Sequence, residues 1–338
     1  MKEIFIHVGA GKTGTTAVQE FLKLNQSRLA NQGLELPVIG RRKSSRLVLH
    51  DALAGGGKRA GGDRAALDLW RQIAKTDAEK VLVTSERFHS RVKSKKGESL
   101  FREVSQILKD FNIRIIFYIR REEDWLESAY EQWIKSGNKR DGESLQAFIK
   151  SPRMSLGRQI YRFSDVFGHE SIIVRPYEPM QFVGGSIFSD FLNVLQVSND
   201  DEFVFPGRRS NPRLLPDALE FKRNLNSVSA SKEEAQLLVA LLKEYSHLMG
   251  HAPVAGNGSP TRIDESDVRE IRAGNADLYS RIAREFLGRS DGRLFYERGQ
   301  SDCADDLPEA EDTSRVCAFL ILRLYQRIRA LEHQLSQR

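Results

Sequence analysis

Cysteine is scarce in this sequence: its 338 residues include only two, Cys303 and Cys317. Two thiols in a chain of this length are too few for a disulfide framework or for a metal site with four thiolate ligands. We therefore expect the protein to work in a reducing, cytoplasmic compartment.

Long apolar runs are missing as well. The sequence contains no run of about 18 apolar residues, the length at which a helix can cross a bilayer. Glu3, Lys12 and Thr13 stand where a secretory signal would have to stay apolar. The sequence therefore predicts no transmembrane segment and no export signal.

The composition is that of a folded protein, and its charge is unevenly distributed. Hydrophobic residues make up 40% and charged residues 29%, which excludes disorder over most of the chain. The first 60 residues hold ten Lys and Arg against four Asp and Glu, and the difference equals the whole net charge of +6. This predicts an anionic ligand near the N-terminal third. Nucleic acid is not expected, because no aromatic residues interleave with the basic ones.

The first two thirds of the chain alternate short apolar runs with amphipathic stretches. Strands are expected over Ile4–Val8, Val81–Thr84, Ile113–Ile119 and Ser171–Arg175. Helices are expected over Thr16–Leu29, Ser99–Lys109, Asp124–Ser136 and Gly157–Phe167. This alternation predicts an α/β fold, a P-loop-like parallel sheet flanked by helices. The glycine-rich segment 55–62 is expected to be a loop.

Beyond Pro206 the pattern becomes helical throughout. Helices are expected over Leu215–Asn226, Lys232–Met249, Glu265–Leu287 and Thr313–Leu335. We expect an α/β core over residues 1–205 and a C-terminal helical extension over 206–338 that packs on this core. The last helix carries apolar residues at spacings of three and four, which suits core packing and also allows a homodimer through this helix.

The sharpest local signal is a glycine-rich junction between the first strand and the first helix. Glycines at positions 9, 11 and 14 let backbone N–H groups converge, and the following helix offers its N-terminal amides. This arrangement predicts a phosphate- or sulfate-binding loop, although a glycine-rich turn with a solvent-facing lysine would look the same. The candidate ligand-binding residues are Gly11, Lys12, Thr13, Gly14, Thr15 and Thr16.

This loop departs from two better-known phosphate loops. A Walker loop needs a glycine five residues before its Gly-Lys pair, and that position is Ile6. A dinucleotide fingerprint matches on the glycines, but Glu35 precedes an apolar run instead of ending one. Both interpretations are therefore disfavoured, while Gly11-Lys12-Thr13 still imitates the end of a Walker loop.

A second constellation follows the third expected strand. Arg120 stands directly after Ile119, at the strand end where open α/β sheets bind ligands, and Ser128 follows eight residues later in a helix. The two side chains can converge on one phosphate. The alternative is that the charged run 120–124 only caps the helix.

Taken together, these motifs resemble the PAPS-dependent sulfotransferases, PAPS being 3′-phosphoadenosine 5′-phosphosulfate. The loop around Lys12 is similar to the family's 5′-phosphosulfate loop, and Arg120 with Ser128 is similar to its 3′-phosphate pair. The segment 84–88, Thr-Ser-Glu-Arg-Phe, resembles the Ser-Ser-Glu-x-Phe stretch of bacterial carbohydrate-type members. The resemblance covers roughly residues 4–205 and, more loosely, the turn 208–211. Gly11 stands where the family often has a proline before the lysine. An enzyme that uses a nucleoside triphosphate therefore stays an alternative.

The resemblance implies sulfuryl transfer from PAPS to a hydroxyl of a saccharide or glycolipid, without a metal. Lys12 would neutralise the leaving oxygen, Thr15 and Thr16 would hold the 5′-phosphate, and Arg120 with Ser128 would hold the 3′-phosphate. Arg208 and Arg209 are further candidates for the 3′-phosphate. A nucleotide-dependent kinase and a non-catalytic phosphate-binding or scaffold module remain the alternatives.

The acceptor hydroxyl also needs a general base. Glu86 comes just past the second expected strand, at the ligand-binding edge of the sheet, and His50 is its rival because imidazole titrates near neutral pH. Salt-bridge or core roles compete for both side chains. His7 and His89 rank below them, because His7 is expected to be buried and nothing in the sequence fixes the direction of His89.

Overall fold

The structure is a computed structural model that describes residues 2–37, 48–55, 62–137, 143–151, 155–200, 202–207, 214–227, 232–249, 263–296 and 313–336. The chain divides into two compact units, each built from three separate stretches. The first unit takes residues 1–122, 153–206 and 269–297, and the second takes 123–152, 207–268 and 298–338. Part of the expected helical extension therefore belongs with the sheet, and the expected two-domain division stays a prediction.

The first unit contains a five-stranded parallel sheet in the order β2-β3-β1-β4-β5. The strands are β1 (Glu3–Val8), β2 (Leu34–Glu35), β3 (Lys80–Ser85), β4 (Asn112–Ile119) and β5 (Ile172–Pro176). In the register, His7 of β1 lies between Thr84 of β3 and Ile116 of β4. The predicted α/β class and parallel sheet are confirmed. The short edge strand β2 was not predicted, because two residues are too few to show a periodicity.

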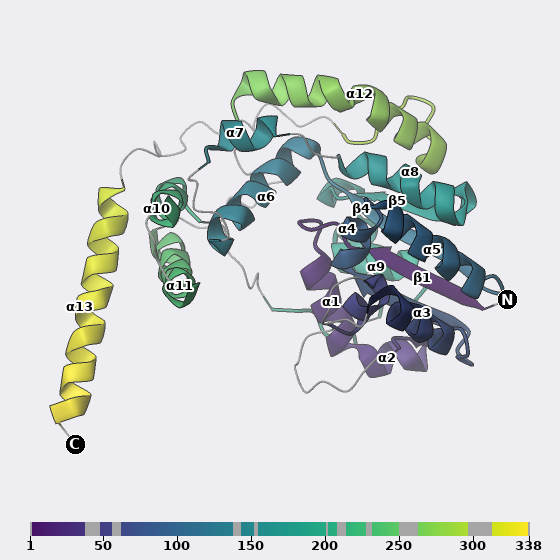
Figure 1. Cartoon of the computed structure of the whole chain (residues 1–338), viewed down its shortest axis with the longest axis horizontal. Coiled ribbons are helices and arrows are strands. Elements are labelled where there is room, and N and C mark those ends of the chain that lie inside the picture. Colours follow the sequence, from purple (N-terminus) through teal and green to yellow (C-terminus); the bar gives the residue numbers. More distant parts are fainter. Residues whose placement is uncertain are drawn as a thin grey trace. The chain divides into compact units, whose positions relative to one another are not determined.

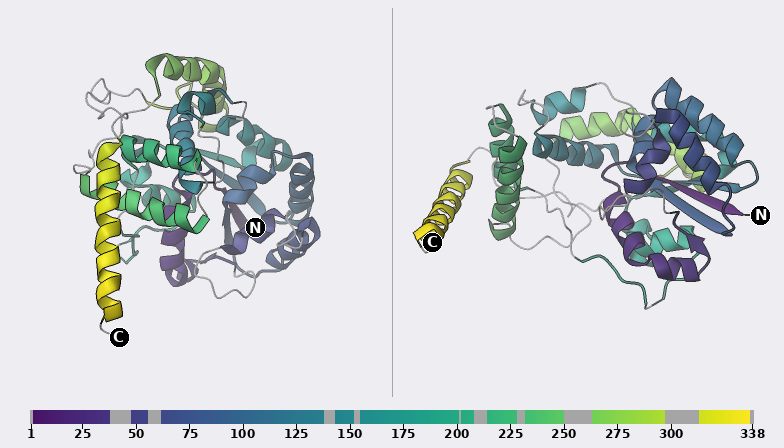
Figure 2. Two further views of the ribbon diagram at one scale, coloured as in Figure 1. Left: turned by 60° about the vertical axis from the view of Figure 1, so that its left-hand side comes forward. Right: turned by 60° about the horizontal axis from the view of Figure 1, so that its bottom comes forward.

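Helices cover both faces of this sheet (Figures 1 and 2). On one face, Phe5, Leu82 and Tyr118 pack in a cluster with Phe21 and Phe191. On the other face, Phe117 of β4 meets Phe163, which in turn contacts Phe101. The helices of this unit are α1 (Thr15–Leu24), α2 (Gln26–Asn31), α3 (Gly62–Ile73), α4 (Glu86–Arg91), α5 (Lys95–Ile107), α8 (Leu156–Phe167) and α9 (Ile187–Val194). A 3₁₀ helix, η1 (Val48–Ala54), precedes α3.

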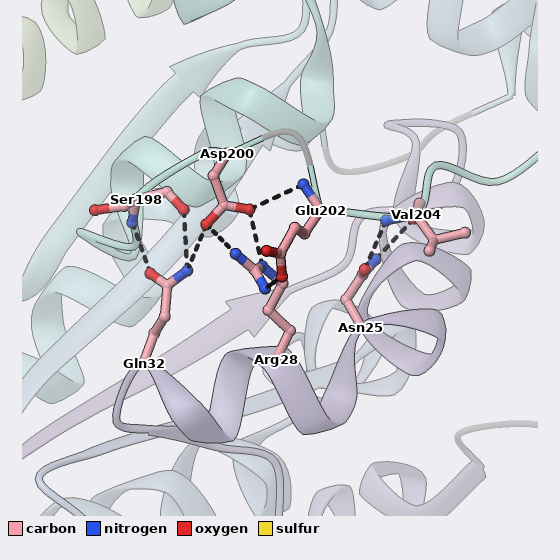
Figure 3. A network of polar contacts seen from close by, with 7 residues as sticks. All are labelled: Asn25, Arg28, Gln32, Ser198, Asp200, Glu202 and Val204. Atoms are coloured by element: carbon pink, nitrogen blue, oxygen red, sulfur yellow. Dashed lines mark hydrogen bonds and ion pairs between the residues drawn. The ribbon is translucent and has the colours of Figure 1, made fainter.

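The helix expected over Thr16–Leu29 is broken in two at Asn25. The Asn25 side-chain amide donates to the carbonyl oxygens of Phe21 and Val204, each at 2.8 Å, and its oxygen accepts from the N–H of Val204. One turn later, Arg28 donates to the carboxylates of Asp200 and Glu202 (Figure 3). The break therefore ties the segment after α9 to the helices that follow β1.

The second unit is helical throughout the residues that the structure describes. It contains most of α6 (Glu122–Ser136), together with α7 (Leu145–Lys150), α10 (Pro216–Ser227), α11 (Lys232–Met249) and α13 (Ser314–Ser336). Its core joins Tyr130, Leu219, Tyr245 and Phe319. The division between the two units falls within α12 (Glu265–Leu287). None of the helices in the described ranges is long and apolar enough to cross a membrane.

Candidate functional site

The candidate site lies at the carboxyl edge of the sheet, between β1 and β3. After β1 the chain passes to the edge strand β2, whereas after β3 it passes to β4 on the opposite side of β1. Connections that leave neighbouring strands in opposite directions open a crevice at the strand ends, where α/β proteins bind ligands. The loop after Val8 and the start of α4 after Ser85 flank this position.

The loop after β1 folds around one carbonyl group. The Ala10 oxygen accepts from the Thr13 hydroxyl at 2.6 Å, the Thr15 hydroxyl at 3.2 Å and the Thr13 N–H at 3.3 Å. Both threonine side chains are buried. Because the C=O and N–H of a trans peptide point in opposite directions, the Gly11 N–H is directed away from these threonines. The two hydroxyls therefore shape the loop, whereas the sequence had assigned them to the ligand.

Lys12 occupies the left-handed backbone region, with φ of 71°. Its carbonyl oxygen accepts from Nη1 of Arg120 at 3.1 Å, so the residue after β4 holds the apex of the loop after β1. The Arg120 guanidinium lies over the ring of Tyr177, 5.7 Å from its centroid. The structure thus brings Lys12 and Arg120 together and adds Tyr177 from the end of β5; their binding of a ligand stays a prediction.

Helix α1 begins in a way that suits an anion. Its N-cap is Gly14 in the left-handed region, no side chain caps the first turn, and no acidic residue lies in that turn. The Val18 N–H donates to the carbonyl oxygen of Gly14 at 3.0 Å and so closes the first turn of the helix. The amides of Thr15, Thr16 and Ala17 thus belong to the uncapped first turn, at the positive end of the helix dipole.

The three glycines of the loop have different roles. A Cβ on Gly9 would lie 2.5 Å from Cγ2 of Thr15, and one on Gly14 would lie 2.5 Å from Cδ1 of Ile187. A Cβ on Gly11 would meet nothing within 4 Å. Close packing against Thr15 therefore favours glycine at position 9, and the left-handed φ of 77° favours it at position 14, whereas position 11 is open on the side where a Cβ would project.

Glu86 stands beside this loop as the first residue of α4. Its Cγ would lie 3.3 Å from a Cβ on Gly9. The side chain reaches solvent, yet the protein around its carboxylate and the negative charge of Asp51 raise the pKa of Glu86 above its usual value, and the nearby charge of Lys12 opposes this shift. Glu86 is thus close to Lys12, as expected of a base in the same site.

Asp51 is held in place by the residue that caps α4. The Ser85 hydroxyl donates to Oδ1 of Asp51 and accepts from the N–H of Arg87 at 3.1 Å. The 3₁₀ helix η1 that carries Asp51 is also fastened by Trp70, whose Nε1 donates to the Leu53 carbonyl at 3.0 Å. Asp51 thereby becomes the neighbour of Glu86 in a pair of carboxylates.

Four predicted site residues stay untested by the structure. His50 lies in η1 next to Asp51, and its side chain lies outside the described part of the structure. Arg208 and Arg209 also fall outside the described residues. Ser128 lies on α6 in the second unit, whereas Arg120 belongs to the first, so their pairing stays a prediction.

The two histidines that ranked lowest are buried. His7 is fully enclosed, its Nδ1 lies 2.9 Å from the Thr84 hydroxyl, and its Nε2 has no hydrogen-bond partner among the described residues. Burial lowers the pKa of His7 to about 3. Burial, together with the charge of Lys93, lowers the pKa of His89 to about 3 as well. Both rings are therefore neutral at physiological pH, and His7 ties β1 to β3 directly behind the loop.

The sequence pattern did not single out Asp51 and Tyr177. Asp51 stood in a segment that was considered only for His50, and its link to Ser85 spans 34 residues. Tyr177 directly follows β5, and its N–H donates to the Ile119 carbonyl at 2.6 Å. A polar residue directly after a buried strand indicates a position at the ligand-binding edge of the sheet. This rule could have identified Tyr177 from the sequence.

The described residues hold no group of three or more His, Cys, Asp and Glu side chains placed to bind a metal ion. The expectation of a metal-free site stays a prediction. What the described residues do bring together is a cation, a helix N-terminus and a carboxylate pair at one edge of the sheet.

Comparisons with known proteins add little to this geometry. No protein-family model matches the sequence. A stretch of 127 residues, 37% of the chain, is 29% identical to a protein of Archaeoglobus fulgidus described as an uncharacterized protein. The aligned stretch covers 30% of that relative's length. The printed description names no activity or ligand, so the chemistry of the site must follow from its own residues.

Proposed function

We propose that this protein is a sulfotransferase with a P-loop-like core, which moves the sulfuryl group of PAPS to a hydroxyl of a saccharide or glycolipid. The proposal rests chiefly on one observation: Lys12, the start of α1, Arg120 and Glu86 meet at one edge of the sheet. Each of these groups matches one requirement of sulfuryl transfer.

The first requirement is to stabilise the leaving group. In the reaction the acceptor oxygen attacks sulfur, the bond from sulfur to the bridging oxygen of the 5′-phosphate breaks, and its electron pair stays on that oxygen. The Lys12 ammonium and the first-turn amides of α1 are positive groups that would offset this charge. Because the hydroxyls of Thr13 and Thr15 donate to Ala10, we assign the phosphate contacts to backbone amides and to the exposed hydroxyl of Thr16.

The second requirement is to remove the acceptor proton. Glu86 supports this role because it lies beside Lys12 and because its pKa is raised, which makes the carboxylate a stronger base. The proton passes from the acceptor hydroxyl to the Glu86 carboxylate as the new oxygen–sulfur bond forms. His50 remains the alternative base, since it adjoins Asp51 in η1.

The third requirement is to select PAPS over ATP, and we assign it to Arg120. Its guanidinium already contacts the loop through the Lys12 carbonyl and lies over Tyr177. A guanidinium in this position can reach a second phosphate, and the Tyr177 ring limits where the guanidinium can go. Ser128, Arg208 and Arg209 would complete this part of the proposed site.

Calorimetric titration with adenosine 3′,5′-bisphosphate and with ATP-Mg tests the proposal. We expect binding of the bisphosphate alone, and transfer of labelled sulfate from PAPS to at least one member of a saccharide and glycolipid panel. Lys12→Ala should reduce turnover more than nucleotide affinity, because charge on the bridging oxygen develops in the transition state. Lys23→Ala, an exposed lysine in the last turn of the same helix, serves as the matched control.

The same titration identifies the alternatives. Preference for ATP-Mg would replace the proposal with a nucleotide-dependent kinase. Binding of the bisphosphate with no transfer to any acceptor would favour a non-catalytic phosphate-binding or scaffold module.

A further inference from the structure

Helix α13 carries two apolar stripes, of which one is buried within its own unit. Val316, Phe319 and Leu320 in its first turns pack into the core of the second unit. Arg323 continues this side of the helix with an ion pair to Glu244 of α11 at 2.6 Å. Figure 2 shows α13 extending past α10 and α11.

The second stripe is exposed to solvent. It consists of Ile321, Leu324, Ile328 and Leu331, whose exposed fractions range from 43% to 67%. At 100° per residue the centre of this stripe lies about 110° from the centre of the buried stripe, with Leu324 and Leu331 on the side nearer to Leu320. Solvent exposure of four large apolar side chains along one side of a helix is unfavourable. Burial of this stripe against a partner would remove that exposure.

The spacing of the exposed stripe is that of a coiled coil. The four residues follow one another at intervals of three, four and three, which places isoleucine at both a positions and leucine at both d positions of a heptad. Isoleucine at a with leucine at d favours two parallel strands. Within a parallel arrangement, the a and d residues of the stripe therefore favour a pair of helices.

The charges beside the stripe agree with this direction. Arg327 occupies a g position and Glu332 the following e position. In a parallel pair these positions face each other across the seam, so two opposite-charge pairs form. In an antiparallel pair g faces g, and Arg327 would meet Arg327 of the second copy. Charge complementarity thus favours a parallel pair of identical helices.

We propose that α13 pairs with α13 of a second copy of this chain as a parallel two-stranded coiled coil. The seam is formed by Ile321, Leu324, Ile328 and Leu331, and it is flanked by contacts between Arg327 and Glu332. This pairing is independent of the proposed chemistry, because none of its residues lies in the candidate site. The pairing joins two copies through their second units. It uses no residue of the candidate site at the sheet edge.

Sedimentation velocity of the full chain tests the pairing. The chain should be a dimer at tens of micromolar, and Leu324→Lys should raise the dissociation constant at least about a hundredfold, because two leucines leave the seam. Leu322→Lys is the matched control: Leu322 is also exposed, lies on the same helix and falls outside the seam. Circular dichroism checks that each variant keeps its helix content. A monomer at about 200 µM, or equal effects of the two substitutions, would overturn the proposal.

Charge reversal tests the identity and the direction of the partner. Arg327→Glu and Glu332→Arg should each weaken the dimer about tenfold, since each replaces two attractive pairs with two repulsive ones. The double variant should recover to within about threefold of the unaltered chain, and the two single variants should pair with each other when mixed. Arg315→Glu, at an exposed position of the same helix outside the seam, is the control for the change in net charge.

A disulfide reports the direction of the helices. Leu331→Cys, with both native cysteines changed to serine, should form a cross-linked dimer under oxidation, because identical d positions face each other in a parallel pair. No recovery in the double charge variant, or no cross-link while sedimentation still shows a dimer, would overturn the parallel pairing.

Discussion

Arg120 Nη1 donates to the carbonyl oxygen of Lys12 across 3.1 Å, and this contact links the end of β4 to the loop that follows β1. Lys12 is in the left-handed region, which costs a residue with a side chain on the order of 1 kcal/mol. The hydrogen bond from Arg120 offsets part of this cost. The orientation of the loop therefore depends on a side chain that comes 108 residues later in the sequence.

Substitution of Arg120 should affect two nucleotides unequally. Arg120→Ala should weaken the binding of adenosine 3′,5′-bisphosphate by about 2 kcal/mol or more, the scale of a charge-assisted contact. The loss of binding free energy for 5′-AMP should be smaller. That nucleotide has no 3′-phosphate, so only the loosened loop affects its binding. Calorimetry with both nucleotides measures the difference, and equal losses would mean that Arg120 only holds Lys12.

Two loop glycines provide a matched pair of substitutions. Gly9→Ala places a methyl group 2.5 Å from Thr15, whose hydroxyl is already engaged with Ala10, so we expect a loss of about 1–3 kcal/mol in the free energy of unfolding. Gly11→Ala meets nothing within 4 Å and should change this free energy little. Urea denaturation of the two variants provides the comparison. If both variants lose the same stability, Thr15 can move and the loop is not packed as described.

The pH below which activity is lost should depend on Asp51. Glu86 must be deprotonated to act as a base, and its raised pKa places the loss of activity at a higher pH than an ordinary glutamate would. Asp51→Asn removes a negative neighbour, which lowers the pKa of Glu86 and should move this loss of activity to lower pH. The pH profile of kcat/KM with PAPS measures the shift.

A substitution of each candidate base completes this experiment. Glu86→Gln should reduce turnover roughly a hundredfold or more with nucleotide binding intact. Full activity of Glu86→Gln together with loss of activity in His50→Ala would assign the base to His50. In that case Asp51 would act on its direct neighbour in η1 instead of on Glu86.

Stability at mildly acidic pH should depend on His7. The pKa of His7 is about 3 in the folded protein and about 6.5 in an unfolded chain, so only the unfolded chain takes up a proton between these values. The free energy of unfolding should therefore fall with pH below about 6, by about 1.4 kcal/mol per pH unit for this group. His89 adds a similar slope, because its pKa is lowered in the same direction.

His7→Gln should remove the share of His7 from this slope, whatever it does to stability at neutral pH. Urea unfolding at pH 7.5, 6.5 and 5.5 gives the slope directly. An unchanged slope in His7→Gln would show that His7 takes up its proton in the folded state.

Elements with strong periodicity were predicted well from sequence. The run Ile113–Ile119 became β4 with one further residue at its N-terminal end, because its residues from Ile115 onward are apolar and buried on both faces. The helix expected over Thr16–Leu29 was wrong at Asn25, where the side chain competes for helix carbonyls and binds Val204. That contact is non-local, and no pattern within the helix announces it.

The candidate site was predictable where it follows local rules. Lys12 and Arg120 each stand next to a strand end, and the parallel sheet brings such ends to one edge. The hydroxyls of Thr13 and Thr15 were expected to face the ligand, and in the structure both donate to the Ala10 carbonyl, a contact that no local pattern announces. The binding of a ligand by this loop stays a prediction. Asp51 was missed because its position depends on Ser85 and Trp70, through contacts that only the folded chain makes.

The contact between Asn25 and Val204 joins positions 179 residues apart, and the first unit also needs residues 269–297. During synthesis, helix α1 therefore leaves the ribosome long before the segment that fixes its far end. By the time the first unit can finish, residues 123–152 and 207–268 of the second unit have been made as well. The two units cannot fold one after the other in chain order, as uninterrupted domains do. Premature termination anywhere before residue 269 leaves both units incomplete, so a shortened chain exposes apolar surface of both at once.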